Sequence, residues 1–462
     1  MMRSQFTSGM PGFTLVWVGQ LVSLLGTAMT AFGLGLWAWQ ETGQATALAL
    51  VGFFTFGPTV LLSPVAGALV DRWNRKLVMM FSDLAAGLST IVVLLLYMSG
   101  NLEVWHLYVT GAFAGAFQAF QFPAYSAAIT MMVSKDQYAR ANGMLALAES
   151  SSGIVAPLLA GFLVSVIGIS GILVIDIVTF SFALLALLTV HVPQPPATEA
   201  GREAKGSLWQ ESIYGFRYIV RRPSLLGLQL VFLGANLTGV FAFTVLQPMI
   251  LARTANSAAI LGAVLSAGGI GGVIGGIAMT TWGGPRRRVH GVLGGMILSS
   301  LLGVCVLGLG QSLPMWAVGL FFASFFLPVL NGSNQAIWQA KVAPDVQGRV
   351  FSVRRLIAQI SAPIAMLAAG PLADFVFEPG MRAGGGLTSL FGGLFGTGPG
   401  AGMAVMMFLA GVAGIAVALA GYLFPAVRDA ESILPDHDHA TVGTASSGHA
   451  EIAPVEIETA AA

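Results

Sequence analysis

Long apolar stretches without any charged residue dominate the chain. The runs 13–40, 254–285 and 383–427, for example, contain no Asp, Glu, Lys or Arg. A helix needs about 20 apolar residues to cross the hydrocarbon core of a bilayer. On this criterion the sequence predicts twelve spans, at 13–39, 46–70, 77–98, 104–126, 143–167, 170–191, 224–251, 257–282, 289–309, 314–338, 350–375 and 401–424.

The secondary structure of these spans follows from the lipid that surrounds them. Lipid offers no hydrogen-bond partner to backbone groups, so each span is expected to be a helix. Strands of a transmembrane barrel would alternate in polarity over about ten residues, and no such alternation occurs. The first span, from Phe13, is long and lacks an A-x-A-type cleavage site, which indicates a retained helix and not a signal peptide. The expected fold class is an all-α membrane protein.

The composition agrees with this interpretation. Hydrophobic residues make up 56% of the 462 residues and charged residues only 9%, against about a quarter charged in ordinary soluble domains. A soluble enzyme is therefore excluded. The single cysteine, Cys305, excludes a disulfide framework and Cys-based metal sites. The 21 basic residues are too scattered to form a nucleic-acid-binding face.

The basic residues separate cleanly between the two sides of the predicted membrane. Of the 21 Lys and Arg residues, only Arg253 and Arg382 fall on the side opposite the N-terminus. Because basic residues collect on the cytoplasmic side, both termini are expected in the cytoplasm. An odd number of spans would destroy this separation. The sequence thus predicts a multi-pass protein of the cell membrane.

The segment 192–223 divides the spans six and six. The sequence predicts a cytoplasmic N-terminus at 1–12, a six-helix bundle at 13–191 and a second bundle at 224–425. Within 192–223, apolar residues recur at helical spacing beside Arg217, Arg221 and Arg222, which predicts an amphipathic helix on the inner membrane face. The apolar residues of that helix are Trp209, Ile213, Phe216, Ile219 and Val220. A plain solvated linker is the alternative.

Residues 426–462 have a different composition, with acidic and small residues and no apolar periodicity. Such a segment buries too little apolar surface to fold, so a disordered acidic cytoplasmic tail is expected. The run Asp436-His437-Asp438-His439 could bind a metal only weakly, because nothing fixes the ligand geometry. No metal site is expected.

The two halves repeat each other. Pro123 corresponds to Pro328, Ala156-Pro157 to Ala362-Pro363, and the loop residues Asp136 and Arg140 to Asp345 and Arg349, at offsets of roughly 205 to 209 residues. Six spans per half give both halves the same orientation. The prediction is therefore two six-helix parallel repeats, related by an axis along the membrane normal, that rock about a site at their interface.

A short motif after the second span resembles a known family. Gly67-Ala68-Leu69-Val70-Asp71-Arg72-Trp73-Asn74-Arg75-Lys76 resembles the G-x-x-x-D-R-x-G-R-[KR] motif of the major facilitator superfamily, with Asn74 at the second glycine. The resemblance implies the major facilitator fold. It also implies a cytoplasmic gate, with Asp71 at the N-terminus of span eleven and Arg72 and Arg75 in ion pairs. The alternative is that these charges only mark the inner face.

The full set of gating residues expected from the motif and its repeat is Gly67, Asp71, Arg72, Arg75, Lys76, Arg140 and Arg349. Three further stretches, 135–143, 348–352 and 370–374, are similar to the branch of the superfamily that holds macrolide-efflux and enterobactin-export proteins.

Two glycine-containing helices carry packing signals. Gly153, Pro157 and Gly161 resemble the antiporter motif G-x-x-x-G-P-x-x-G-G, although Ala156 replaces the glycine before the proline. The proline should bend the helix, and the small residues should allow close packing. In span eight, Gly268, Gly272 and Gly276 recur every four residues, which predicts packing within the bundle in preference to dimerisation.

Three acidic residues lie inside spans, where a charge costs at least about 2.5–3.5 kcal/mol. They are Asp83, Glu149 and Asp176, and all three are candidates for proton coupling. Glu149, just before the glycine–proline stretch, is the favoured one. For Asp83 the alternative is a structural ion pair with the gating loop, and for Asp176 a hydrogen bond within the bundle.

Amide side chains in the spans are candidates for the walls of a substrate cavity, and the alternative for each is a hydrogen bond that joins helices. They are Gln20, Gln118, Gln121, Asn236, Gln247, Asn331, Asn334 and Gln335. The remaining surface would be apolar and rich in Met and Phe. Such adaptable walls suit bulky amphipathic molecules better than ions or sugars.

The sequence therefore predicts a secondary active transporter that exports hydrophobic or amphipathic small molecules by proton antiport. No phosphate-binding G-x-x-x-x-G-K-[ST] loop occurs, so the proton gradient is the expected energy source, without a cofactor. We expect a monomer surrounded by membrane lipids. The alternatives are coupled uptake by the same fold, or a membrane enzyme or sensor, for which no convergent catalytic cluster is visible.

Overall fold

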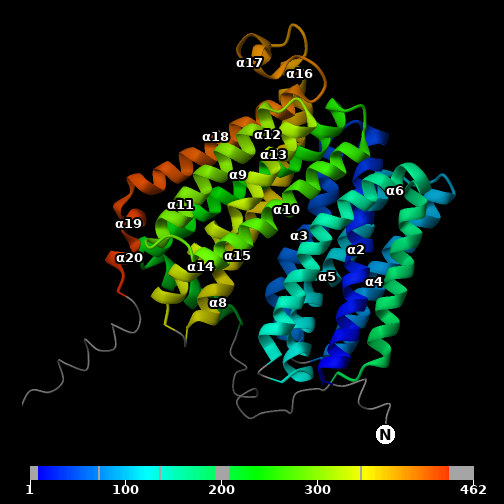
Figure 1. Cartoon of the computed structure of the whole chain (residues 1–462), viewed down its shortest axis with the longest axis vertical. Coiled ribbons are helices and arrows are strands. Elements are labelled where there is room, and N and C mark those ends of the chain that lie inside the picture. Colours follow the sequence, from blue (N-terminus) through cyan, green and yellow to red (C-terminus); the bar gives the residue numbers. More distant parts are fainter. Residues whose placement is uncertain (1–8, 71–72, 135–136, 193–207, 344–345, 436–462) are drawn as a thin grey trace, which may run out of the picture.

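The computed structural model describes residues 9–70, 73–134, 137–192, 208–343 and 346–435. The described residues form helices and no strand, arranged as two groups that meet at one end and separate toward the other (Figure 1). The helices of the first half are α2 (Gly9–Thr42), α3 (Ala45–Val70), α4 (Arg75–Met98), α5 (Val104–Met132) and α6 (Tyr138–Thr189).

Helix α6 is two membrane segments joined by a sharp reversal. At Gly168 the backbone has φ 68° and ψ −178°, a conformation open in practice only to glycine. The two arms then lie antiparallel beside α2. The Trp17 indole donates to the carbonyl of Met144 at 2.7 Å, while a Cβ on nearby Gly19 would lie 3.1 Å from the Cα of Ala183. Predicted spans five and six are thus both present.

The second half contains more interrupted helices. They are α9 (Pro223–Arg253), α10 (Ala258–Trp282), α11 (Arg288–Leu298), the π-helix η2 (Ser299–Cys305), α12 (Val306–Leu309), α13 (Leu313–Phe325), α14 (Leu327–Lys341), α15 (Gln347–Leu372), the π-helix η3 (Ala373–Phe377), α16 (Glu378–Met381), α17 (Thr388–Phe395) and α18 (Ala401–Leu423). Span ten is divided at Phe326, because Pro328 starts a new helix there, whereas Pro123 lies inside a continuous α5.

Within the described residues, ten helices are long and apolar enough to cross a membrane. One of the ten is α6, which contains two arms. Helix α5 is too polar for that criterion, yet it packs between α3 and α4 as a full-length member of the first bundle. The architecture is the expected all-α membrane fold, with six helical segments in each half.

The segment between the halves contains the expected helix, α8 (Leu208–Val220). The structure does not describe the side chains of Trp209 and Ile213. Ile219 is buried in the core of the second half, while Phe216 and Val220 are exposed. One face of α8 thus packs on α15 and α9, and the amphipathic character predicted for the helix stays a prediction.

The first part of the predicted tail is helical. Residues 426–435, predicted to be disordered, continue through the short helices α19 (Pro425–Arg428) and α20 (Ala430–Ile433). The Lys341 ammonium donates to the carbonyls of Glu431 and Leu434, and Val427 and Ala430 are buried. These contacts correct the prediction, because burial and capping by residues far away in the sequence order a segment of low apolar content. The rest of the tail, 436–462, lies outside the described residues.

The two halves touch mainly along two helix pairs, α3 with α15 and α6 with α10, and α3 also contacts α9 and η3. Both pairs depend on small residues. A Cβ on Gly370 would lie 2.7 Å from the Cα of Thr46, and one on Gly269 would lie 2.8 Å from the carbonyl oxygen of Gly153. We call the end of the molecule that carries α8 the linker side and the opposite end the far side; the halves join toward the far side (Figure 1).

The far side of the second half is closed by a compact cap that contains α16 and α17. The Arg253 guanidinium donates to the carbonyls of Gly310 and Phe395, both at 2.9 Å. The carboxylate of Glu378 accepts from the backbone N–H groups of Gly400 and Met403, at 3.2 and 2.9 Å, at the start of α18. These two side chains bind loop ends that apolar packing alone would leave unsatisfied.

Candidate transport cavity

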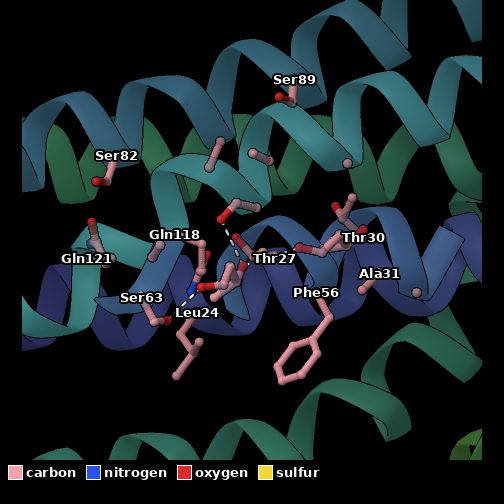
Figure 2. A pocket seen from close by; sticks show the side chains of 18 of the residues that line it. Leu24, Thr27, Thr30, Ala31, Phe56, Ser63, Ser82, Ser89, Gln118 and Gln121 are labelled. Atoms are coloured by element: carbon pink, nitrogen blue, oxygen red, sulfur yellow. Dashed lines mark hydrogen bonds between the residues drawn. The ribbon is translucent and has the colours of Figure 1, made fainter. Parts of the chain in front are cut away.

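One large cavity lies between the two halves, with a volume of about 2020 Å³. Its walls come mainly from α2, α3, α4 and α5, with α6, α9 and α15 completing them. The lining extends from Gly35 and Gln247, near the closed far side, to Ser63, Val65 and Arg349 at the linker side. Figure 2 shows part of this wall, where Leu24 and Phe56 lie among hydroxyl and amide side chains.

All three membrane acids predicted from the sequence line this cavity. Asp83 on α4 is 8% exposed. Its carboxylate accepts hydrogen bonds from the side-chain amides of Gln20 and Gln121, each at 2.8 Å, and these two amides contact each other at 3.3 Å. The observed partners of Asp83 are thus amides from α2 and α5, where an ion pair with the gating loop was the alternative expectation.

Asp176, on the second arm of α6, is 3% exposed. Its two carboxylate oxygens accept from different helices: Thr27 of α2 donates to one at 3.1 Å, and Thr90 of α4 to the other at 2.9 Å. The carboxylate therefore joins three helices of the first bundle, which is the hydrogen-bonding role considered for it.

Glu149 is arranged differently from the other two acids. It lies on the first arm of α6, one turn before Gly153, and its side chain is exposed to the cavity. Within the described part of the chain, no hydrogen bond to its carboxylate is formed. Of the three acids, Glu149 is therefore the one that solvent on the linker side can reach most directly.

Four of the eight predicted cavity amides line the cavity: Gln20, Gln118, Gln121 and Gln247. The other four are used elsewhere. Asn236 donates to the carbonyl of Phe232 in its own helix, and Asn334 accepts from the Trp338 indole. Gln335 accepts from Arg354, and Asn331 lines a separate small groove beside α10.

A band of hydroxyl groups and two basic residues complete the lining. Thr55, Thr59 and Ser63 form a stripe along α3, and each donates to a carbonyl one turn earlier. Their four-residue spacing was the sequence signal that could have identified the cavity face of this helix. Arg349 and Arg355 of α15 lie on the opposite wall.

The antiporter-like residues Gly153, Pro157 and Gly161 lie where the two halves cross, and not on the cavity floor. A Cβ on Gly161 would lie 2.7 Å from the carbonyl oxygen of Ala258. Gly262 of α10 packs in the same way on the carbonyl of Pro157. The glycines allow α6 and α10 to touch backbone to backbone.

The glycines of α10 contact two different helices. Gly268 packs on Leu320 of α13, within the second bundle as expected, while Gly269 packs on Gly153 of α6 across the halves. Around Gly272 and Gly276 an added Cβ would meet nothing within 4 Å. The cross-half contact was not anticipated, because a glycine repeat does not identify its partner.

Part of the predicted gate cannot be placed. Asp71 and Arg72 lie outside the described residues, and nothing is described of Gly67 beyond its place in α3.

The Lys76 ammonium donates to the carbonyls of Leu188 and Val190 at 2.9 and 2.8 Å, at the end of α6. Arg75 begins α4, and Arg140 is exposed near the start of α6. Arg349 lies 5.7 Å from the ring centre of Tyr214 in α8.

Comparisons with known proteins agree with this architecture. The chain is 26% identical over 371 residues to macrolide efflux protein A of Streptococcus pyogenes, covering 78% of this chain and 89% of that protein. It is 25% identical over 316 residues to the enterobactin exporter EntS of Shigella boydii serotype 18, covering 68% and 73%.

Among solved structures, a bacterial homologue of the human lysosomal transporter Spinster, in an inward-facing and unoccupied conformation, matches with a TM-score of 0.63 and 16% identity, over 89% of this chain and 96% of that one. A bacterial homologue of the iron transporter ferroportin, in an inward-facing state, matches with a TM-score of 0.61 and 15% identity, over 88% and 98%. The model of the Major Facilitator Superfamily matches residues 16–366, more than half of the chain. The chain therefore belongs to the Major Facilitator Superfamily.

Proposed function

We propose that this chain is an exporter of hydrophobic or amphipathic small molecules, driven by the exchange of protons across the cell membrane. The observation that carries the proposal is the cavity itself, which both halves line and which is closed on the far side. The positive-inside pattern puts the linker side in the cytoplasm, so this state would take its substrate from the cytoplasm.

The size and chemistry of the cavity support a bulky amphipathic substrate. Its volume of about 2020 Å³ exceeds the roughly 300–1,000 Å³ of ordinary ligand pockets. Apolar side chains such as Leu24, Phe56 and Leu356 alternate with hydroxyls and amides, so shape and apolar contact would dominate over a fixed set of hydrogen bonds. The export functions of the two named relatives point in the same direction.

Proton exchange requires a carboxyl group that can be reached from both sides in turn. Glu149 is our candidate, because it is exposed in the open cavity and its carboxylate has no hydrogen bond in the described structure. Its place beside the α6–α10 crossing would let protonation influence the contact between the halves.

The experiment is transport in inverted membrane vesicles with an imposed pH gradient. Fluorescent amphipathic compounds and a catechol siderophore would serve as probes, with an ionophore that collapses the gradient as the control. Export predicts accumulation inside inverted vesicles when their lumen is acidic. Accumulation only in right-side-out vesicles would identify uptake, and chemical turnover of a probe without movement would identify an enzyme.

To test whether the cavity carries the transport, we suggest Gln118→Trp, which would fill the cavity wall. Leu95→Trp offers a matched control, because Leu95 is 62% exposed on α4 and absent from the cavity lining. Transport lost in the first variant and retained in the second would support the cavity as the route. Equal transport by both variants would contradict it.

A further inference from the structure

The carboxylate of Asp176 lies in a pocket built from three helices that approach unusually closely. A Cβ on Gly26 of α2 would lie 3.0 Å from Oδ1 of Asp176, and one on Gly87 of α4 would lie 2.5 Å from the ring of Phe180. Glycine at both positions lets α2 and α4 pack directly on the arm of α6 that carries the acid. The proposed export mechanism, which assigns proton exchange to Glu149, uses this buried acid only to join helices.

Three threonine hydroxyls converge on this one carboxylate. Thr27 and Thr90 each donate to one of its oxygens, at 3.1 and 2.9 Å. Thr30, one turn beyond Thr27 on α2, lies beside the same carboxyl and is 7% exposed. Figure 2 shows Thr27 and Thr30 on consecutive turns of the helix along the cavity wall. Together the cluster offers five oxygen atoms.

The hydroxyl oxygen of Thr30 differs from the other two. Its Oγ1 is buried and faces the Asp176 carboxyl, but it forms no hydrogen bond of regular geometry among the described residues, although a threonine in a helix usually bonds the carbonyl one turn back. Leaving a buried polar group unsatisfied costs about 1–3 kcal/mol. An oxygen atom held unpaired beside a carboxylate is available as a ligand.

The charges of the cluster select the kind of ligand. Asp176 has no Lys or Arg partner in the described structure, so the site carries one negative charge. The described residues include no group of three or more His, Cys, Asp or Glu side chains, the ligands that divalent and transition metals ordinarily take. A single carboxylate surrounded by hydroxyl oxygens suits a hard monovalent cation.

Sodium fits this arrangement better than a proton alone. A proton would occupy one carboxylate oxygen and would use none of the three hydroxyl oxygens as a ligand. Sodium needs several oxygen ligands, and the hydroxyls of Thr27 and Thr90 can rotate to present their lone pairs to an ion. All four side chains line the central cavity, so an ion in the cavity can reach them.

We propose that Asp176, Thr27, Thr30 and Thr90 form a sodium-binding site. Because it rests on the proposed function, the inference adds a second cation to the transport cycle, bound separately from the proton at Glu149. Bound sodium joins α2, α4 and α6 more firmly than the hydrogen bonds do, and it neutralises the buried charge.

Direct binding to the purified full-length protein tests the site without transport. The melting temperature would be measured at fixed pH while NaCl replaces choline chloride at constant ionic strength, with KCl in a parallel series. Since a ligand that binds only the folded state stabilises it by RT ln(1 + [L]/Kd), the melting temperature should rise with the logarithm of the Na⁺ concentration above Kd and should not rise with K⁺. Equal melting temperatures in NaCl and choline chloride would overturn the proposal.

Variants locate the effect. Asp176→Asn should abolish the sodium response, and Thr30→Val should weaken the apparent affinity for Na⁺ about tenfold or more, whereas Thr30→Ser should retain it. Asp83→Asn is the matched control, because Asp83 is also a buried membrane acid but is held by amides. A sodium response that survives in Asp176→Asn as it does in Asp83→Asn would refute the site. If Asp176→Asn does not fold, Thr30→Val and Thr30→Ser still decide.

Transport distinguishes failure of this inference from failure of the proposed function. A sodium gradient at equal pH and a pH gradient at equal sodium would be imposed separately on inverted vesicles. Export that follows the pH gradient, with no sodium effect on melting or transport, would refute the sodium site alone. Sodium-dependent melting without export under either gradient would refute the exporter and leave the site standing.

Discussion

The carboxylate of Asp374, at the end of span eleven, accepts hydrogen bonds from the backbone N–H groups of Ala45 and Thr46 at 2.9 and 2.8 Å. The two amides begin α3 in the opposite half, so the acid of one bundle caps a helix of the other. A negative charge at a helix N-terminus contributes about 0.3–1 kcal/mol at exposed sites, and up to about 2 kcal/mol where the pair is partly buried. This contact stabilises the state that is closed on the far side.

We therefore predict that Asp374→Ala shifts the protein toward a state open on the far side. A cysteine would be introduced at Gln247, which lies at the closed end of the cavity, in a Cys305→Ser background. The rate at which this cysteine reacts with a membrane-impermeant thiol reagent added on the far side would measure the change. Loss of about 1–2 kcal/mol corresponds to a roughly 5- to 30-fold faster reaction.

The control for this prediction is Glu378→Ala. Glu378 also caps a helix with its carboxylate, but that helix, α18, belongs to the same half. Its removal should lower stability without changing access to the cavity. An unchanged labelling rate in Asp374→Ala, or an equal increase in both variants, would show that the cross-half cap does not control the far side.

Glu149→Gln should uncouple transport from the pH gradient. The amide keeps the size of the side chain but cannot bind and release a proton, so accumulation driven by an acidic vesicle lumen should fall to the level seen with the ionophore. Exchange of labelled for unlabelled substrate without a gradient should continue. Glu103→Gln, outside the cavity in the loop before α5, is the control. Full gradient-driven export by Glu149→Gln would eliminate Glu149 as the coupling residue.

The cluster of Asp83, Gln20 and Gln121 should behave as one unit in stability. Removing one member leaves buried polar groups of the others unpaired, at about 1–3 kcal/mol. We expect Asp83→Leu and Gln121→Leu each to lower the melting temperature, and the double variant to lower it by clearly less than the sum. Such coupling, about 0.5–3 kcal/mol for residues in one network, is read from a double-mutant cycle. Strictly additive losses would show that the three side chains do not act together.

The crossing of α6 and α10 should not tolerate even one added methyl group at its centre. Gly262→Ala would place a Cβ against the carbonyl oxygen of Pro157, so we expect the halves to separate there, with transport largely lost. Gly272→Ala, on the same helix, meets nothing within 4 Å and should gain about 0.5–1 kcal/mol of helix stability. Transport rates and melting temperatures of the two variants in parallel test this, and a harmless Gly262→Ala would contradict the packing.

The sequence by itself determined the membrane class, the six-and-six division and the positions of the helices to within a few residues. The physical reason is that these features depend on one-dimensional properties. An uncharged stretch of sufficient length must be helical in lipid. The number of basic residues in a short loop indicates on which side of the membrane the loop lies. The three membrane acids were identifiable for the same reason, because a charge in such a stretch is conspicuous.

Only the tertiary structure decided which polar groups meet. In a soluble protein, the polar face of a helix points to water, so the apolar face can be identified as the buried one. In a membrane, both the face toward lipid and the face toward other helices are apolar. The sequence therefore could not show that Gln118 lines the cavity while Asn236 bonds its own helix. It also could not show that Asp374 caps α3, because nothing local marks a contact between residues more than 300 positions apart. These contacts depend on the direction of each side chain and on how the two halves pack together.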